Sequence, residues 1–596
     1  MDTNLQAASI KSNLGRRKTD QPTMPKMLKA AVHKGYDIYP NHSLENGKIL
    51  NGYETLAIWL ADKKSVALDG YVGVFWEDVK DGLEQEFSRL ALTVNWVDAA
   101  DYLKTPNTIE KMVAPFLGSV GDVWGTKAKL SLGDFFEPTF KVTSNTDDKL
   151  TIVYGCGAQL IAPDATLVYF DLPKNELQLR MRAGSITNLG AAEAEHPNEM
   201  YKRFYFVDWV VLNEYKKSLL NKIEIFADGQ WDNDVNWIKG ADLMDGLKQL
   251  SKTSFRVKPW FEPGAWGGQW MKERIVGLSR EVVNYAWSFE LIVPENGLVF
   301  ESDGNLLEVS FDMLMFAQRK AILGEQAEKF GDEFPIRFDF LDTWQGGSLS
   351  VQCHPSVPYI QKHFGETITQ DETYYILDAE ENANVYLGFQ ENINPEEFRA
   401  VLEKSKESGQ KIEITDYVQS HAAKKHDLFL IPNGTVHSAG AGNMVLEISA
   451  TPYIFTFKMY DWVRLGLDGK PRPINIEHAF ENLRFEFKGD KVQEELISKP
   501  SLIKTGADWK IIHLPTHQDH FYDVHRLEFE TKIMVDTNDS CHVLMLVEGE
   551  SILVTVNGEK QLYHYAETFV VPADAISYTL QNKGTSEAKV IKAFLK

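Results

Sequence analysis

The 596-residue chain is poor in cysteine and has no long apolar run. Its three cysteines, Cys156, Cys353 and Cys541, stand far apart without CxxC spacing, so the sequence suggests neither a disulfide framework nor a thiolate zinc site. A membrane span would need about 18 consecutive apolar residues, and none is found. Segment 1–20 carries basic residues but no apolar core of a secretory signal. We therefore expect a soluble, cytoplasmic protein that has no membrane contact.

The chain also has fewer basic than acidic residues. The chain has 85 acidic and 62 basic residues and a net charge of −23. Such a balance opposes the counterion release on which nucleic-acid binding depends, so we expect no nucleic-acid partner. Any phosphate that the protein recognises must meet a local basic site. The length is several times that of one hydrophobic core, which predicts three or four domains.

The residue pattern predicts a multidomain protein that joins an α/β part to all-β parts. We expect a flexible tail and lead-in over residues 1–51, an α/β domain over 52–252, a β-domain over 253–500 and a smaller β-domain over 501–596. Short β-rich segments with Gly and Pro turns, typical of antiparallel barrels, begin near Phe255. One amphipathic helix starts at Pro395 after the cap residue Asn394 and is predicted to be an insertion between strands.

The α/β region contains a possible nucleotide-binding turn. Between Lys64 and Trp76 the pattern predicts a buried strand, a glycine turn and the start of a helix. A phosphate-binding loop at such a place needs a lysine for the phosphate charge and a Ser or Thr for magnesium. Phe75 and Trp76 stand at those positions. Residues 60–250 resemble a degenerate uridine-kinase-like P-loop domain, which implies a related scaffold whose defining motif is broken.

Candidate metal ligands lie on three predicted strands of the 253–500 region. In the strand 349–355, alternation puts Ser350 on the same face as two of the candidates and turns Cys353 away from it. Two imidazoles, a carboxylate and an amide oxygen form a donor set that suits zinc and leaves room for a water or a substrate oxygen. Such a set also accepts other divalent ions. The candidates are Gln352, His354, Glu372 and His437.

With their surroundings these residues resemble class I mannose-6-phosphate isomerases. The motifs that carry the resemblance follow one order along residues 255–490: Trp266-Gly267-Gly268, Phe334-Pro335, Leu341-Asp342, Gln352-x-His354-Pro355, Glu372-Thr-Tyr-Tyr, Pro432-Asn-Gly-Thr-Val-His437 and Tyr460-Asp461-Trp462. The resemblance implies a zinc cupin β-barrel of the jelly-roll type with a helical insertion, and a second cupin barrel at the C-terminus. It also implies one Zn²⁺ per chain, held by the four candidates.

The same resemblance suggests further site residues. It implies Glu447 as a proton carrier, with a solvated carboxylate at the barrel rim as the alternative reading. The candidate catalytic residues are Glu447, Lys458 and Arg464, and the candidate substrate-binding residues are Ser350, Trp266, Arg337 and Lys458.

Two positions depart from the family pattern. Lys458 stands where the family has an arginine, and Asp339 stands where it often has a lysine. Lysine and arginine are not interchangeable where a bidentate grip is required. Arg337 lies two residues before Asp339 and should face the same side, so it is a possible substitute. Arg464 or Lys458 is the alternative contact for a phosphate.

Three functions follow as hypotheses. The first is a zinc-dependent aldose–ketose isomerase that interconverts mannose 6-phosphate and fructose 6-phosphate, or acts on a related sugar phosphate, through an enediolate. The second is a sugar-phosphate-binding regulatory cupin protein without turnover. The third, a bifunctional isomerase and kinase, requires a phosphate loop that Phe75 and Trp76 disrupt. The oligomeric state stays open.

Overall fold

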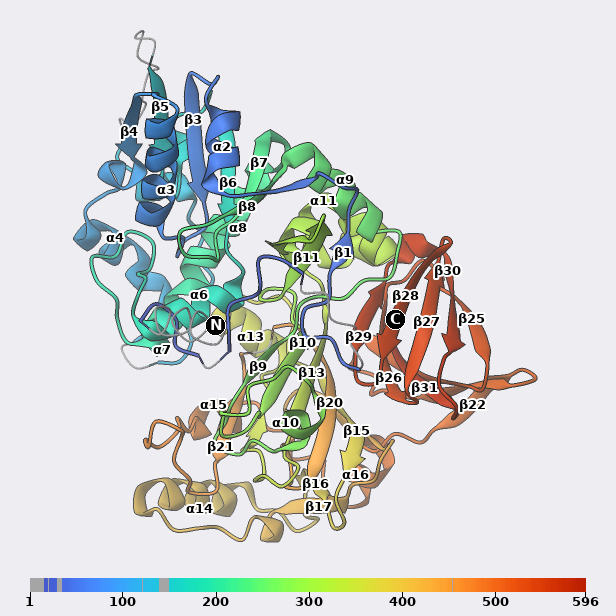
Figure 1. Cartoon of the computed structure of the whole chain (residues 1–596). Helices are drawn as coiled ribbons and strands as arrows, with labels where there is room; N and C mark the ends of the chain where they lie inside the picture. Colours follow the sequence, from blue (N-terminus) through green and yellow to red (C-terminus); the bar gives the residue numbers. More distant parts are fainter. Residues whose placement is uncertain (1–14, 20, 29–34, 120–121, 139–148, 453) are drawn as a thin grey trace. The chain divides into compact units, whose positions relative to one another are not determined.

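The computed structural model of the chain describes residues 15–19, 21–28, 35–119, 122–138, 149–452 and 454–596. The chain forms two compact units, shown with all their elements in Figure 1. Unit 1 comprises residues 1–31, 39–249 and 294–318, and unit 2 comprises residues 32–38, 250–293 and 319–596. Within the described residues, no helix has both the length and the apolar character needed to cross a membrane. The three cysteines are free thiols.

Unit 1 is built on a seven-stranded sheet with the order β2-β8-β7-β6-β3-β5-β4. The five strands from β7 to β4 are parallel, and β8 and β2 extend the sheet in antiparallel fashion. Central β3 is an almost continuous buried run, as expected of a parallel strand covered on both faces. The strands are β2 (Ile49–Asn51), β3 (Ser65–Gly70), β4 (Val94–Asp98), β5 (Leu150–Tyr154), β6 (Thr166–Asp171), β7 (Ile223–Asp228) and β8 (Asn236–Lys239).

Helices separate these strands, and a small second sheet completes unit 1. The three-stranded sheet has the order β1-β11-β12, in which β1 is parallel to β11. Its strands are β1 (His42–Ser43), β11 (Gly297–Ser302) and β12 (Asn305–Ser310). The helices are α2 (Tyr53–Leu60), α3 (Trp76–Arg89), α4 (Pro106–Val113), α5 (Ala158–Ile161), α6 (Lys174–Ala183), α7 (Pro197–Arg203), α8 (Trp209–Leu219) and α9 (Gly240–Leu250). Helix α11 (Phe311–Leu323) begins in this unit and ends in unit 2.

Unit 2 begins with two sheets that share one core. The six-stranded sheet has the order β18-β15-β20-β13-β10-β9 and the five-stranded sheet the order β17-β16-β19-β14-β21. Tyr374 and Ile376 of the first sheet and Val385 and Leu387 of the second belong to the same buried cluster. The strands are β9 (Trp260–Glu262), β10 (Trp287–Leu291), β13 (Ile336–Asp342), β14 (Val351–Cys353), β15 (Glu372–Ala379), β16 (Asn384–Phe389), β17 (Val418–Ala422), β18 (Leu428–Ile431), β19 (His437–Ala439), β20 (Asn443–Ala450) and β21 (Phe457–Tyr460).

The predicted helical insertion is α14 (Pro395–Ser408), between β16 and β17. The Asn394 side chain accepts hydrogen bonds from the backbone N–H groups of Glu396 and Glu397 and so caps the helix. Phe398 and Leu402 are buried on one face, as the amphipathic pattern predicts. The other helices of unit 2 are α10 (Trp270–Arg274), α12 (Ala327–Phe330), α13 (Val357–Phe364), α15 (Ile476–Phe480) and α16 (Asp490–Glu495).

The C-terminal part of unit 2 is a second pair of sheets with a core of its own. Their orders are β22-β23-β24-β31-β26-β29 and β25-β30-β27-β28. The strands, red in Figure 1, are β22 (Ser501–Thr505), β23 (Trp509–Leu514), β24 (Tyr522–Phe529), β25 (Lys532–Asp536), β26 (His542–Glu548), β27 (Ser551–Val556), β28 (Glu559–His564), β29 (Thr568–Val571), β30 (Ser577–Asn582) and β31 (Ala588–Leu595).

The compact units differ from the predicted domain boundaries in two places. Residues 294–318, inside the predicted β-domain, belong to unit 1, because β11 pairs with β1. Residues 15–19, 21–28 and 35–51 lie in the predicted tail and lead-in, and they contain β1, β2 and the buried Arg17. Within this segment Arg17 forms an ion pair with Glu176, and β2 pairs with β8. Residues 1–14 lie outside the described part of the chain.

Candidate metal centre

The predicted ligands His354, Glu372 and His437 meet in one buried cluster. One candidate ligand atom from each lies within 4.8 Å of the others. The Nε2 atom of His354 is 3.0 Å from one Glu372 carboxylate oxygen, and the Nε2 atom of His437 is 3.4 Å from the other. Gln352 joins the cluster, because its Nε2 atom is 3.3 Å from His437 Nε2.

Strand register explains why residues so far apart in sequence meet. Gln352 in β14 lies directly opposite His437 in β19 on one side and Lys458 in β21 on the other. Directly opposed residues in antiparallel strands project from the same face. Glu372 starts β15 on the other sheet of this core, opposite Ser449. The cluster therefore lies between the inner faces of the two sheets.

Both imidazoles are oriented by backbone carbonyls. His354 Nδ1 lies 3.0 Å from the Phe455 carbonyl oxygen, and His437 Nδ1 lies 2.9 Å from that of Thr435. A proton on each Nδ1 leaves the Nε2 lone pair directed at Glu372, the arrangement found in metal-binding histidines. The turn before His437 is tight: Gly434 has φ +77°, and a Cβ atom there would lie 2.4 Å from the Asn482 carbonyl oxygen. Only glycine fits this turn without displacing backbone.

The cluster fits a divalent metal ion. The Nε2 atom of His354 and one carboxylate oxygen of Glu372 are buried and form no hydrogen bond among the described residues. Burial lowers the pKa of His437, which favours the neutral, metal-binding imidazole. Burial opposes ionisation of Glu372, but the nearby His354 and then His437 outweigh burial and hold the pKa of Glu372 well below its usual range. A carboxylate with two imidazoles is a zinc-type donor set.

Glu447, the predicted proton carrier, lies on the same inner face, opposite Tyr374 in β15 and Asp339 in β13. It is buried rather than solvated at a rim. Arg337 forms an ion pair with Glu447, binds Asp339 through Nε at 2.8 Å, and lies 3.8 Å from Glu372. Arg337 and Asp339 thus face the same side, as alternation predicts, and the arginine lies between the Glu372 carboxylate and the candidate base Glu447.

Lys458 and Arg464 belong to a second polar group beside Gln352. The Arg464 guanidinium binds the Ser348 carbonyl oxygen and the Asp461 carboxylate, each at 2.6 Å. Arg472 binds Asp461 at 3.1 Å. Burial and the nearby Arg472 lower the pKa of Lys458 to about 8. Two arginines therefore bind a single carboxylate with Lys458 nearby, so the group has more positive than negative charge and can accept an anion.

The remaining predicted residues have structural contacts. The Ser350 hydroxyl donates to the Gln352 side-chain oxygen at 3.0 Å and so orients a candidate ligand. Trp266 is 1% exposed, belongs to the hydrophobic core and packs edge-on against Trp287. The structure places Trp266 in that core rather than in the polar cluster, which indicates packing. Its substrate-binding role stays a prediction.

Sequence reasoning missed two polar residues at the site. The Gln370 side chain donates to the Glu372 carboxylate. The sequence could have predicted this contact, because Gln370 lies two residues before Glu372 and strand alternation puts both side chains on one face. Arg472 had no comparable signal, because its position beside Asp461 depends on how the 461–475 segment folds back. The hydrogen bond from the Asn475 backbone N–H to the Lys458 carbonyl oxygen, 2.7 Å long, closes this segment.

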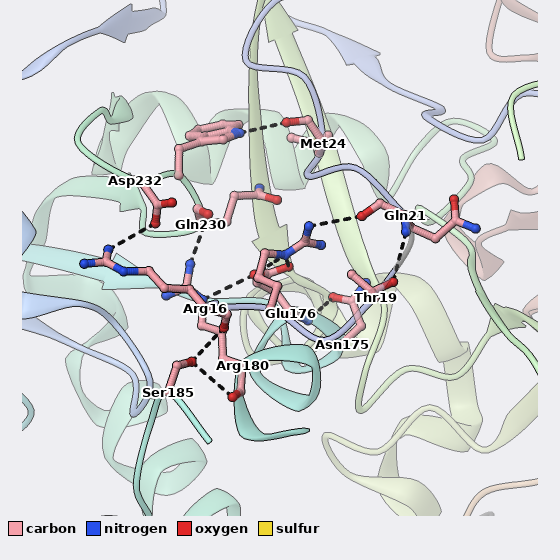
Figure 2. Close-up of polar contacts among 12 residues, drawn as sticks. Arg16, Thr19, Gln21, Met24, Asn175, Glu176, Arg180, Ser185, Gln230 and Asp232 are labelled. Atoms are coloured by element: carbon pink, nitrogen blue, oxygen red, sulfur yellow. Dashed lines mark hydrogen bonds and ion pairs between the residues drawn. The ribbon is translucent and has the colours of Figure 1, made fainter. Parts of the chain in front are cut away.

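In unit 1 the turn after β3 holds aromatic and guanidinium groups. The Phe75 ring lies 4.5 Å from the Arg16 guanidinium and 4.2 Å from that of Arg180. Arg180 donates to the carbonyl oxygens of Gly73 and Gln230 at 2.8 and 3.0 Å. Figure 2 shows polar contacts of Arg16, Thr19, Gln21 and Met24, including the hydrogen bond of Arg16 to Asp232. At the position of a phosphate-binding lysine, unit 1 therefore has a packed ring.

Known proteins of two different kinds match different parts of the chain. A family model described as a domain of unknown function (DUF8485) matches residues 52–252. The chain is 27% identical over 224 residues to mannose-6-phosphate isomerase ManA of Bacillus subtilis, which covers 38% of this chain and 66% of ManA. It is 26% identical over 259 residues to the probable mannose-6-phosphate isomerase GmuF of the same organism, covering 43% of this chain and 74% of that protein.

A solved structure gives a similar partial match. The crystal structure of mannose 6-phosphate isomerase from Bacillus subtilis matches 57% of this chain and 99% of its own, with 19% identity and a TM-score of 0.45. The sequence match to ManA spans about two thirds of the length of ManA. More than half of the present chain lies outside each of its sequence matches to ManA and GmuF. The chain contains a region related in sequence to mannose-6-phosphate isomerases, beside a region, residues 52–252, that matches a family of unknown function.

Proposed function

We propose that the protein is a zinc-dependent isomerase that interconverts an aldose phosphate and a ketose phosphate, with mannose 6-phosphate and fructose 6-phosphate as the leading pair. The observation that carries the proposal is the buried cluster of His354, Glu372 and His437, in which Glu372 shares the inner face of its sheet with Glu447. The sequence similarity to mannose-6-phosphate isomerases supports the choice of substrate class.

The reaction moves a proton between two neighbouring sugar carbons. Glu447 would accept the proton from one carbon and return it to the other, and Arg337 would stabilise the carboxylate in its ionised form, before the first transfer and after the second. His354, Glu372, His437 and Gln352 would hold the zinc ion. When bound, zinc supplies an electrophile that polarises a sugar oxygen. Burial of all these groups would exclude water and limit loss of the proton to solvent.

The phosphate would bind beside the metal site. Lys458 lies opposite Gln352 on the neighbouring strand, and Arg464 and Arg472 share one acidic partner, Asp461. Lys458 Nζ forms no hydrogen bond or ion pair with the residues that the structure describes, so its charge can be met by a phosphate oxygen. Charge-assisted hydrogen bonds of this kind contribute about 1.5–3 kcal/mol each. We assign the phosphate to this trio.

A second function, sugar-phosphate binding without turnover, is favoured by one observation. Glu447 is ion-paired with Arg337, and such a pair stabilises the carboxylate and weakens it as a base. A protein of this kind would keep the metal and the phosphate trio and would respond to the sugar phosphate by binding alone.

A coupled assay separates the two functions. Purified protein is given mannose 6-phosphate, with and without a chelator, and formation of fructose 6-phosphate is followed. The isomerase proposal expects turnover that the chelator and His354→Ala remove and that His196→Ala, an exposed histidine in unit 1, leaves intact. Absence of turnover together with calorimetric binding of mannose 6-phosphate would support the binding protein and contradict the isomerase.

A further inference from the structure

The C-terminal part of unit 2 contains a second group of metal-binding side chains. His513, Asp523 and His525 each offer a ligand atom, and these atoms lie within 4.8 Å of one another. His513 Nε2 is 2.9 Å from an Asp523 carboxylate oxygen. The rings of His513 and His525 have centroids 5.4 Å apart. The group shares no residue with the His354, Glu372 and His437 cluster.

Strand register builds this group. His513 in β23 lies directly opposite His525 in β24, so the two imidazoles project from one face. Asp523 is two residues before His525 on the same strand and shares that face. The face is the inner one: farther along β24 it carries Leu527 and Phe529, which belong to the core of this part of the chain. The group therefore lies on the inner face, at the end of β24 that precedes the apolar core residues.

The side chains are available to bind a ligand. Neither ring nitrogen of His525 forms a hydrogen bond within the described part of the chain, and its ring contacts are His513 and Phe594. A neutral imidazole has a free lone pair for a metal.

Partial exposure leaves coordination positions open. The side chains of His513 and Asp523 are 31% and 18% exposed, whereas His354 and Glu372 are 0% and 1% exposed. Two histidines and one carboxylate with open positions form an exchangeable site for a borderline divalent ion such as Zn²⁺, Co²⁺ or Ni²⁺. We infer that His513, Asp523 and His525 bind a second divalent metal ion, independently of the proposed isomerase site.

Lys592 makes a specific test possible. It lies opposite His525 in β31, is 6% exposed, and holds its Nζ 4.3 Å from the centre of the Phe594 ring. Its positive charge opposes a dication on the adjacent strand. Removing the charge of Lys592 should therefore tighten metal binding. If the same residues instead formed an anion-binding pocket, removing that charge would weaken binding of the anion.

The experiment uses the full-length, untagged protein with the first site removed by His354→Ala and His437→Ala. Zn²⁺ is measured by equilibrium dialysis, and Co²⁺ by its visible absorption. We expect one equivalent of metal in this background and none after His513→Ala with His525→Ala. Asp523→Asn, a nearly isosteric change, should weaken binding at least tenfold, and Lys592→Met should tighten it several-fold.

Controls separate the site from misfolding. His564→Ala changes another histidine of the C-terminal sheets and should keep the full equivalent, and the melting temperature of each variant reports its folding. Absence of bound metal in the His354→Ala, His437→Ala background would overturn the inference. So would full retention of metal after the His513 and His525 changes in a folded protein, or loss of metal in Lys592→Met.

Discussion

At the scale of single residues, burial sets the chemistry of the charged groups. Asp228 ends β7 in unit 1, where its carboxylate accepts hydrogen bonds from the Glu308 and Gln230 backbone N–H groups at 2.8 and 3.1 Å. Burial, and then the charge of Glu308, raise the pKa of Asp228 to about 8. A buried carboxyl group is thus protonated at neutral pH, whereas the same group ionises near pH 4 in the unfolded chain.

This shift makes the stability of unit 1 dependent on pH. Between about pH 4 and pH 8 the folded state holds a proton that the unfolded state lacks, so the free energy of unfolding falls as pH rises, by at most about 1.4 kcal/mol per pH unit. The contribution is fully present below pH 4 and is lost as pH rises through 8. We expect Asp228→Asn to flatten this slope in urea unfolding at pH 5, 6 and 7. The exposed control Asp62→Asn should keep it, and an unchanged slope in Asp228→Asn would contradict the assignment.

Lys458 provides a second test at residue scale, which rests on the proposed function. Loss of its charge in Lys458→Met should raise KM for the sugar phosphate at least tenfold, because a charge-assisted hydrogen bond to phosphate is lost. Lys458→Arg keeps the charge and should stay within a few-fold of the wild type. KM is measured by steady-state kinetics. The control is Lys406→Met, which removes an exposed lysine of α14 and should leave KM unchanged. An unaltered KM in Lys458→Met would place the phosphate elsewhere.

At the scale of elements, local sequence determines helix α14. Its cap residue Asn394 satisfies two backbone N–H groups, and Pro395 occupies the first turn. We expect Asn394→Ala to destabilise the helix by about 1 kcal/mol, visible as faster amide exchange in the first turns of α14. Asn394→Asp retains the acceptor oxygen and should exchange like the wild type. Equal exchange in all three proteins would show that the cap contributes nothing.

The turn after β3 gives the second prediction at this scale. A phosphate loop needs backbone N–H groups open to the ligand and a lysine, whereas here Phe75 is packed between Arg16 and Arg180. We therefore expect isothermal titration with Mg·ATP to show no binding heat at micromolar concentration, while a nucleotide kinase run in parallel gives a clear isotherm. Saturable binding of ATP in this range would contradict this reading of the turn.

At the scale of the whole molecule, the chain forms two compact units. A ligand that binds only the folded state stabilises it by RT ln(1 + [L]/Kd), about 4 kcal/mol at a thousandfold excess over Kd. Both candidate metal sites belong to unit 2. In calorimetry we expect a chelator to lower the melting temperature of the transition of unit 2 and to leave that of unit 1 unchanged. The His354→Ala, His437→Ala protein should respond less, and an equal shift of both transitions would contradict separate units.

The sequence alone determined the features that depend on near neighbours. Strand alternation placed Ser350, Gln352 and His354 on one face, and the cap and apolar stripe predicted α14. The kinds of donor atom and their order along the chain indicated a metal site, because metal preference depends on ligand chemistry.

Only the tertiary structure decided which distant strands lie opposite each other. Strand pairing joined Arg337 to Glu447, and the folded 461–475 segment brought Arg472 to Asp461. It also set His513 directly opposite His525. Register between separate strands is fixed by long-range hydrogen bonding and by burial of a shared core, and neither is written in the local pattern.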